Sequence, residues 1–307
     1  MPQTVVRTSG LSKTYGTVDA VAGIDLEIQE GEVVAVLGPN GAGKTTTIEM
    51  LLGLRTPTSG VVEVFGADPL AVRHRVGAML QDTDAPESLT VAEIVGLVGS
   101  YYPYRLPTPL VLERADLVAQ ARMRVTQLSG GQRARLSFGL AIVGDPDLLY
   151  LDEPTASLDV GARRAFWTQV SGLTDLGKTI LFSTHNLAEA DAVAERIVVI
   201  ARGRVIHDGT PQQIKALVAG RTLQLTTDAP LSSVRDLPGV RNVHAGADLP
   251  GGSRPVTIQA ATAEPVLQAL FASPHEVRDL IVAEASLEEA FVHLTSGAPD
   301  VAEENRR

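Results

Sequence analysis

The segment Gly38-Pro39-Asn40-Gly41-Ala42-Gly43-Lys44-Thr45-Thr46 constrains the fold more than any other part of this 307-residue chain. It matches the phosphate-loop pattern, in which a glycine and four further residues precede Gly-Lys-Thr. The preceding residues 32–37 are mostly apolar and β-branched, which predicts a buried strand. A helix is expected over residues 46–54. A strand, a glycine loop and a helix in this order predict an α/β fold with a phosphate site at the loop.

Each residue type in this loop has a physical role beside a phosphate. Glycines carry no Cβ, so successive backbone N–H groups can point inward. The following helix adds partial positive charge at its N-terminus. We expect Lys44 to place its ammonium against the β- and γ-phosphates and Thr45 to offer a hydroxyl to Mg²⁺. The alternative interpretation is a glycine-rich turn ahead of a helix.

Composition excludes several other classes of protein. The formal net charge is −10, with a pI near 5.1, which argues against nucleic acid as a partner. The chain has no cysteine, so disulfides and thiolate metal sites are excluded, and its six histidines are scattered. No apolar run approaches the ~20 residues that span a bilayer, and the N-terminus lacks a secretory pattern. We therefore expect a cytoplasmic protein.

Polar residues end three of the predicted strands. Gln81 lies near the end of the strand at 75–82, where it could coordinate Mg²⁺ or simply be a surface residue. Asp152 and Glu153 end the apolar strand that starts at 147, and His185 ends the strand that starts at 178. Ligands collect at the carboxyl ends of strands in open α/β sheets. We expect Asp152 to hold Mg²⁺, Glu153 to activate water and His185 to contact the γ-phosphate. A helix cap for the acidic pair and a structural role for the histidine are the alternatives.

Two further segments are candidate ligand contacts. Leu128-Ser129-Gly130-Gly131-Gln132 precedes a predicted helix over 133–143, with Ser129 as its N-cap. Its two glycines expose N–H groups at a helix start, which makes a second anion-binding end; a plain Gly-Gly turn is the alternative. Tyr15 precedes a glycine turn, where it could stack on an adenine ring or pack as an ordinary tyrosine.

The remaining patterns predict the domain organisation. Helical stretches at 89–100, with Thr90 as N-cap, and at 110–124 interrupt the alternation of strands and helices, which indicates a separate helical lobe. Beyond a hairpin at 196–209 and a helix at 211–219, short strands and helices predict a small two-layer α+β unit. We expect a domain over 1–218 with its helical subdomain at about 83–145, a second domain over 219–296 and a polar tail over 297–307.

Taken together, these motifs resemble the ATP-binding cassette (ABC) ATPases over roughly residues 4–218. The matching segments are the aromatic-loop Tyr15, Walker A over 38–46, the Q-loop Gln81, the signature over 128–132, Walker B over 148–153, the D-loop Ser157-Leu158-Asp159 and the switch histidine His185. The resemblance implies a P-loop NTPase core with a mixed central sheet, an antiparallel β subdomain and a helical subdomain. It implies ATP and Mg²⁺ as cofactors, catalytic roles for Lys44, Gln81, Glu153 and His185, and nucleotide contacts from Asp159 and the signature.

The resemblance also implies partners. In this family the signature of one copy covers ATP held by the Walker A of another, so this single cassette needs a second copy of itself or a paralogous ATPase. Residues 286–295 resemble the ending of ATPase subunits of drug and antibiotic exporters of the daunorubicin-resistance type. We therefore expect an ATP-hydrolysing exporter subunit that sits on the inner face of the cell membrane through a separate permease. The alternatives are a soluble cassette ATPase of repair, translation or cluster assembly, and a regulator that binds ATP without hydrolysing it.

Overall fold

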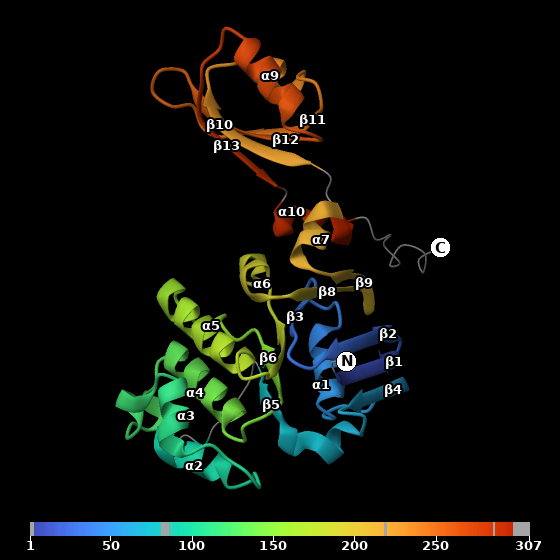
Figure 1. Cartoon of the computed structure of the whole chain (residues 1–307), viewed down its shortest axis with the longest axis vertical. Helices are drawn as coiled ribbons and strands as arrows, with labels where there is room; N and C mark the ends of the chain where they lie inside the picture. The colour runs from blue at the N-terminus through green and yellow to red at the C-terminus, as the bar shows by residue number, and fades with distance from the viewer. Residues whose placement is uncertain (1–2, 81–85, 87, 218–219, 285, 297–307) are drawn as a thin grey trace. The chain divides into compact units, whose positions relative to one another are not determined.

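The structure, a computed structural model, describes residues 3–80, 86, 88–217, 220–284 and 286–296. The chain separates into two compact units, Met1–Pro211 and Gln212–Arg307 (Figure 1). The boundary that we expected at residue 218 stays a prediction. No helix in the described ranges is long and apolar enough to cross a bilayer.

The first unit is built around a six-stranded sheet in the order β5-β6-β7-β3-β8-β9. The first five strands of this order are parallel, and β9 pairs with β8 as an antiparallel hairpin. The central strands β3, β6 and β7 are buried along their whole length, as expected for parallel strands covered on both faces. The bounds are β3 Val33–Leu37, β5 Val76–Met79, β6 Leu148–Asp152, β7 Thr179–Ser183, β8 Arg196–Ala201 and β9 Arg204–Gly209.

A three-stranded antiparallel sheet in the order β2-β1-β4 forms the second layer. Its strands are β1 Thr4–Tyr15, β2 Val18–Gln29 and β4 Ser59–Val64. The first strand extends well beyond the predicted residues 4–7, because its register shifts repeatedly against β2 and the resulting bulges keep a polar, glycine-containing stretch within the ladder. This sheet packs against the main core through Val6, Leu11 and Ile24, which are fully buried there.

The helical lobe consists of α2 Val91–Gly99, α3 Thr108–Arg114 and α4 Gly130–Ile142, which contact one another. The predicted N-cap of α2 is confirmed, since Thr90 and Glu93 form a reciprocal capping box. The predicted helix over 110–124 is wrong in its second half. It ends at Arg114 because Asp116 takes a left-handed φ of 53° and pairs with Arg135 of α4, and short 3₁₀ turns follow.

Other helical elements connect the strands of the first unit. They are α1 Lys44–Leu51, α5 Val160–Thr174 and α6 Leu187–Val193, with 3₁₀ turns η1 Pro69–Arg75, η2 Val118–Gln120 and η3 Val125–Gln127. Helix α7, Pro211–Leu217, begins at the boundary between the units.

The second unit has the order β10-α8-β11-β12-α9-β13, with an antiparallel sheet in the order β11-β12-β10-β13. This is the ferredoxin-like split β-α-β arrangement, and it confirms the two-layer α+β prediction from the tail sequence. Its core joins strand residues such as Leu223 and Ile258 to Val266 and Leu270 of α9. The bounds are β10 Arg221–Thr227, α8 Leu231–Arg235, β11 Val240–Ala245, β12 Arg254–Ala260, α9 Glu264–Ala272, β13 Val277–Glu284 and α10 Leu287–Ser296.

Candidate active site

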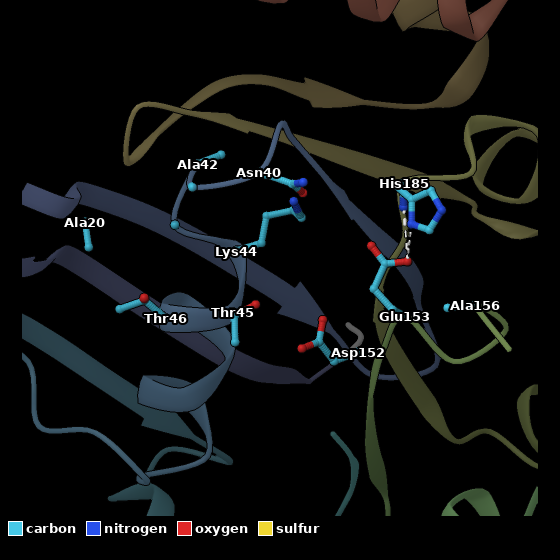
Figure 2. Close-up of a pocket in the computed structure, with 12 residues that line it drawn as sticks. Ala20, Asn40, Ala42, Lys44, Thr45, Thr46, Asp152, Glu153, Ala156 and His185 are labelled. Carbon is cyan, nitrogen blue, oxygen red and sulfur yellow. Dashed lines mark hydrogen bonds and ion pairs between the residues drawn. The ribbon is translucent and has the colours of Figure 1, made fainter. Parts of the chain in front are cut away.

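A cavity of about 620 Å³ lies at the carboxyl ends of β3, β6 and β7, which are neighbours in the sheet. Because parallel strands deliver their carboxyl ends to one edge, residues more than a hundred positions apart meet there. Figure 2 shows Lys44, Asp152, Glu153 and His185 arriving from three different segments. The lining residues are Ala20, Asn40, Gly41, Ala42, Gly43, Lys44, Thr45, Thr46, Asp152, Glu153, Ala156 and His185.

The loop after β3 lines this cavity, and two of its positions require glycine. Gly43 caps α1 with a φ of 103°, and a Cβ there would collide with the carbonyl oxygen of Ala20. At Gly38 a Cβ would collide with the carbonyl oxygen of Ile200 on β8. A φ of 103° is also strained for any residue that carries a side chain. The glycines therefore let the loop approach β2 and β8 closely while it turns its backbone toward the cavity.

Lys44 lies half-buried at the start of α1. Its Nζ donates to the carbonyl oxygens of Gly38 at 2.7 Å and Pro39 at 3.2 Å. Burial lowers the pKa of the ammonium, while the negative charges of Glu153 and Asp152 act in the opposite direction. The loop therefore holds a partly desolvated cation at the cavity wall, which strengthens its attraction to an anion such as a phosphate.

Asp152 is held by Ser183, the last residue of the neighbouring strand. Asp152 is 4% exposed, and Ser183 Oγ donates to its Oδ1. The same Oγ accepts the backbone N–H of Glu153 at 3.1 Å. The sequence interpretation missed Ser183, although a hydroxyl at the end of an otherwise apolar strand was the available signal. One buried serine therefore fixes both acidic residues at the edge of the sheet.

Glu153 and His185 form a direct pair. His185 Nδ1 lies 2.7 Å from Glu153 Oε2, and the backbone N–H of His185 donates to the same oxygen at 3.3 Å (Figure 2). An ionised carboxylate only accepts, so Nδ1 carries the proton of this contact. The Glu153 side chain is 15% exposed, whereas that of His185 is 70% exposed. A shielded carboxylate next to an accessible imidazole at a cavity is an arrangement that can accept a proton from water and contact a ligand.

The oxygens of Thr45 and Asp152 fit a hard divalent cation. Both residues line the cavity, and hydroxyl and carboxylate oxygens are the donors that Mg²⁺ takes. Within the described ranges there is no cluster of three or more His, Asp or Glu residues able to hold a metal alone. The remaining ligands of such an ion would therefore be water and substrate phosphates. Gln81, the third predicted ligand, lies outside the described residues.

The other predicted contacts do not line the cavity. Tyr15 is 41% exposed, with Lys13 and Arg55 over its ring. Ser129 caps α4 in a reciprocal box with Gln132, at 3.3 Å and 2.9 Å, which leaves Gly130 and Gly131 in the first turn. Asp159 caps α5 by accepting the N–H of Ala162 at 2.8 Å.

Comparison with known proteins accounts for this arrangement of loop, acidic strand end and histidine. A family model described as "ABC transporter" matches residues 21–156. The daunorubicin resistance ATP-binding protein DrrA3 of Streptomyces coeruleorubidus is 36% identical over 96% of this chain and 97% of its own length. The chain belongs to the ATP-binding cassette ATPases. The chain is therefore an ATP-hydrolysing cassette, and the loop that lines its cavity matches the Walker A pattern.

Two further relatives and one solved structure show the same similarity. The daunorubicin/doxorubicin resistance ATP-binding protein DrrA of Streptomyces peucetius is 37% identical over 97% of the chain and 94% of its own length. The Nod factor export ATP-binding protein I of Paraburkholderia xenovorans is 38% identical over 72% of the chain and 75% of its own length. A solved ATP-binding subunit of an ABC transporter superposes with a TM-score of 0.64 at 28% identity, covering 69% of this chain and 92% of that one. The P-loop ABC fold is therefore confirmed.

Proposed function

We propose that this cassette is the energy-supplying subunit of an exporter, in which ATP closes a head-to-tail dimer that drives a separate membrane permease. The observation that carries the proposal is the alignment with the daunorubicin resistance proteins, which covers 96% of the chain and so extends through the second unit. Those relatives' names support cargo of the drug or antibiotic class, and lipid-like cargo stays a prediction. The chain would then lie at the inner face of the cell membrane, held there by the permease.

In the proposed mechanism Lys44 offsets charge on the β- and γ-phosphates, and Glu153 accepts the proton of the attacking water. His185 contacts the γ-phosphate and, through the Glu153 contact at 2.7 Å, orients the carboxylate. Thr45, Asp152 and Gln81 would hold Mg²⁺, which supplies Lewis-acid neutralisation of the phosphate charge. Because phosphoryl transfer needs little covalent help, positioning and electrostatics supply most of the rate.

The proposed dimer is supported by a helix N-terminus that does not line the chain's own cavity. The capped N-terminus of α4, with Ser129 and Gly130 exposed, carries partial positive charge but lies outside the lining of the chain's own cavity. A second copy that presents this end to the cavity would enclose the triphosphate from both sides. The ATP-binding cassette MJ0796, 26% identical with a TM-score of 0.62, has been solved as a dimer.

A second cavity supports a docking site for the permease. It measures about 570 Å³ and lies among α1, η1, β5 and α2, with Tyr101 at its rim 75% exposed. Its walls combine apolar side chains with two basic ones, which suits an amphipathic helix inserted from a partner. The lining residues are Leu51, Leu52, Pro69, Arg73, His74, Val76, Ala78, Val98, Tyr101 and Tyr102.

The variant Glu153→Gln tests the catalytic part. We expect its ATPase turnover to fall by a factor of about 10²–10⁴, because a positioned general base is lost, while ATP binding persists. With ATP it should run as a stable dimer in size-exclusion chromatography, and addition of ADP in place of ATP should leave it monomeric. Normal turnover would remove Glu153 from the mechanism, and a monomer with ATP bound, even with the permease present, would refute the head-to-tail arrangement.

Co-purification with a candidate permease, such as a membrane protein encoded by an adjacent gene, tests the docking site. Tyr101→Asp should lose that partner, because it adds charge at the rim of the apolar cavity, and should retain ATP binding. Leu176→Ser is the matched control, since Leu176 is 61% exposed, follows α5 and does not line this cavity. Equal recovery of the partner with both variants would contradict docking at this cavity.

A further inference from the structure

A buried carboxylate that the mechanism above does not use lies directly behind the catalytic pair. Glu189, in the first turn of α6, is 5% exposed. Its Oε1 accepts the hydroxyl of Thr155 at 2.5 Å, and its Oε2 accepts the hydroxyl of Thr184 at 3.2 Å. Arg163 Nε of α5 lies 2.9 Å from Oε1. One side chain therefore contacts three separate segments.

The two threonines flank the catalytic residues in the sequence. Thr155 comes two positions after Glu153, and Thr184 comes one position before His185. Both are buried, at 3% and 2% exposure. Each hydroxyl donates a hydrogen bond to a different oxygen of the same carboxylate. The turn after β6 and the turn after β7 are therefore held by one side chain. The distance between those turns sets the contact between Glu153 and His185.

Thr155 also belongs to the turn that leads to α5. Its carbonyl oxygen accepts the N–H of Leu158 at 3.0 Å, directly before Asp159 caps that helix. Arg163 lies one turn further along α5 and reaches the same carboxylate. The Glu189 carboxylate thus joins the start of α5 to the two catalytic turns.

We propose that Glu189 is a positioning residue for ATP hydrolysis, which holds the turn of Thr155 against the turn of Thr184 so that Glu153 and His185 stay in contact. This inference rests on the proposed roles of Glu153 and His185. A buried carboxylate without partners is strongly unfavourable. Here two hydroxyls donate to it, and the guanidinium of Arg163 balances its charge. The position therefore demands a carboxylate, because a neutral amide can accept on only one of its two terminal atoms.

The test separates the hydroxyl of Thr155 from its bulk. Valine has nearly the shape of threonine without the hydroxyl, and serine keeps the hydroxyl without the methyl group. We expect kcat of Thr155→Val to fall about 10-fold or more with KM for ATP within about two-fold, since the phosphate loop is untouched. Thr155→Ser should retain most of the turnover. Glu189→Gln should reproduce the loss, and the double variant Thr155→Val/Glu189→Gln should be no worse than Glu189→Gln alone.

Thr179→Val is the matched control. Thr179 is fully buried at the other end of β7, and its hydroxyl accepts the N–H of Gly31 at 3.0 Å, away from the cavity. It should lose stability without the selective loss of kcat. A series in which Thr155→Val is active and Thr155→Ser is impaired would overturn the proposal, because packing would then be what matters. Additive losses of kcat in the double variant would also overturn the proposal. Glu153→Gln, assayed alongside, reports separately on the proposed function: if it turns over normally, the catalytic role itself is wrong.

Discussion

Replacing Ser183 with alanine tests how much its hydroxyl contributes to the stability of the first unit. Ser183 is fully buried, donates to Asp152 and accepts the N–H of Glu153. The N–H of Glu153 keeps a second acceptor, the carbonyl oxygen of Ser183 at 3.2 Å, so the main loss is the hydrogen bond to the Asp152 carboxylate. Hydrogen bonds to charged groups contribute about 1.5–3 kcal/mol. We expect the free energy of unfolding of the first unit to fall by about this amount.

The assay uses the only tryptophan of the chain, which lies in the same unit. The Trp167 ring stands 4.7 Å from that of Phe182, the residue before Ser183, so its fluorescence reports on unfolding there rather than in the second unit. For a unit of this size, each 1 kcal/mol shifts Tm by roughly 2–4 °C, which gives a decrease of about 3–12 °C. Ser171→Ala, at an exposed position of α5, should change Tm little. A Ser183→Ala variant with unchanged Tm and unchanged ATPase activity would refute the reasoning.

Two further predictions concern charge and burial. Because burial lowers the pKa of Lys44 from 10.5, and because a triphosphate binds the protonated form better, ATP affinity should fall as pH rises through that lowered pKa. Titration of a fluorescent ATP analogue into Glu153→Gln at increasing pH measures this affinity. In the Lys44→Arg background the affinity should not vary with pH over the same range, since arginine stays charged. Tyr150→Phe should raise the unfolding free energy by about 1 kcal/mol, because the buried hydroxyl of Tyr150 has no hydrogen-bond partner among the residues that the structure describes. Trp167 fluorescence in urea measures the change, and a clear destabilisation would contradict it.

Most of the first unit could be predicted from the sequence because its signals are local. The local signals are the phosphate loop, the apolar strands that end at Asp152 and at Ser183, two residues before His185, and the capping residues Thr90 and Ser129. The strand ends meet at one cavity because parallel topology requires it. These predictions needed no knowledge of contacts between distant segments.

Features set by distant contacts were missed. The length of β1 depends on bulges against β2, and the early end of α3 depends on the pairing of Asp116 with Arg135 of α4. The roles of Ser183 and Glu189 were missed for the same reason, since each acts across neighbouring strands or helices. Tertiary partners of this kind leave no periodic signal in the chain.

The backbone of Glu153 has a consequence for any attempt to make this ATPase more robust. Its φ of 49° lies in the left-handed region, which costs a residue with a side chain roughly 1–2 kcal/mol and costs glycine little. Selection for heat resistance alone would therefore favour glycine or asparagine there, and would discard the carboxylate in the process. Under the proposed role of Glu153, stability and turnover therefore favour different residues at this position.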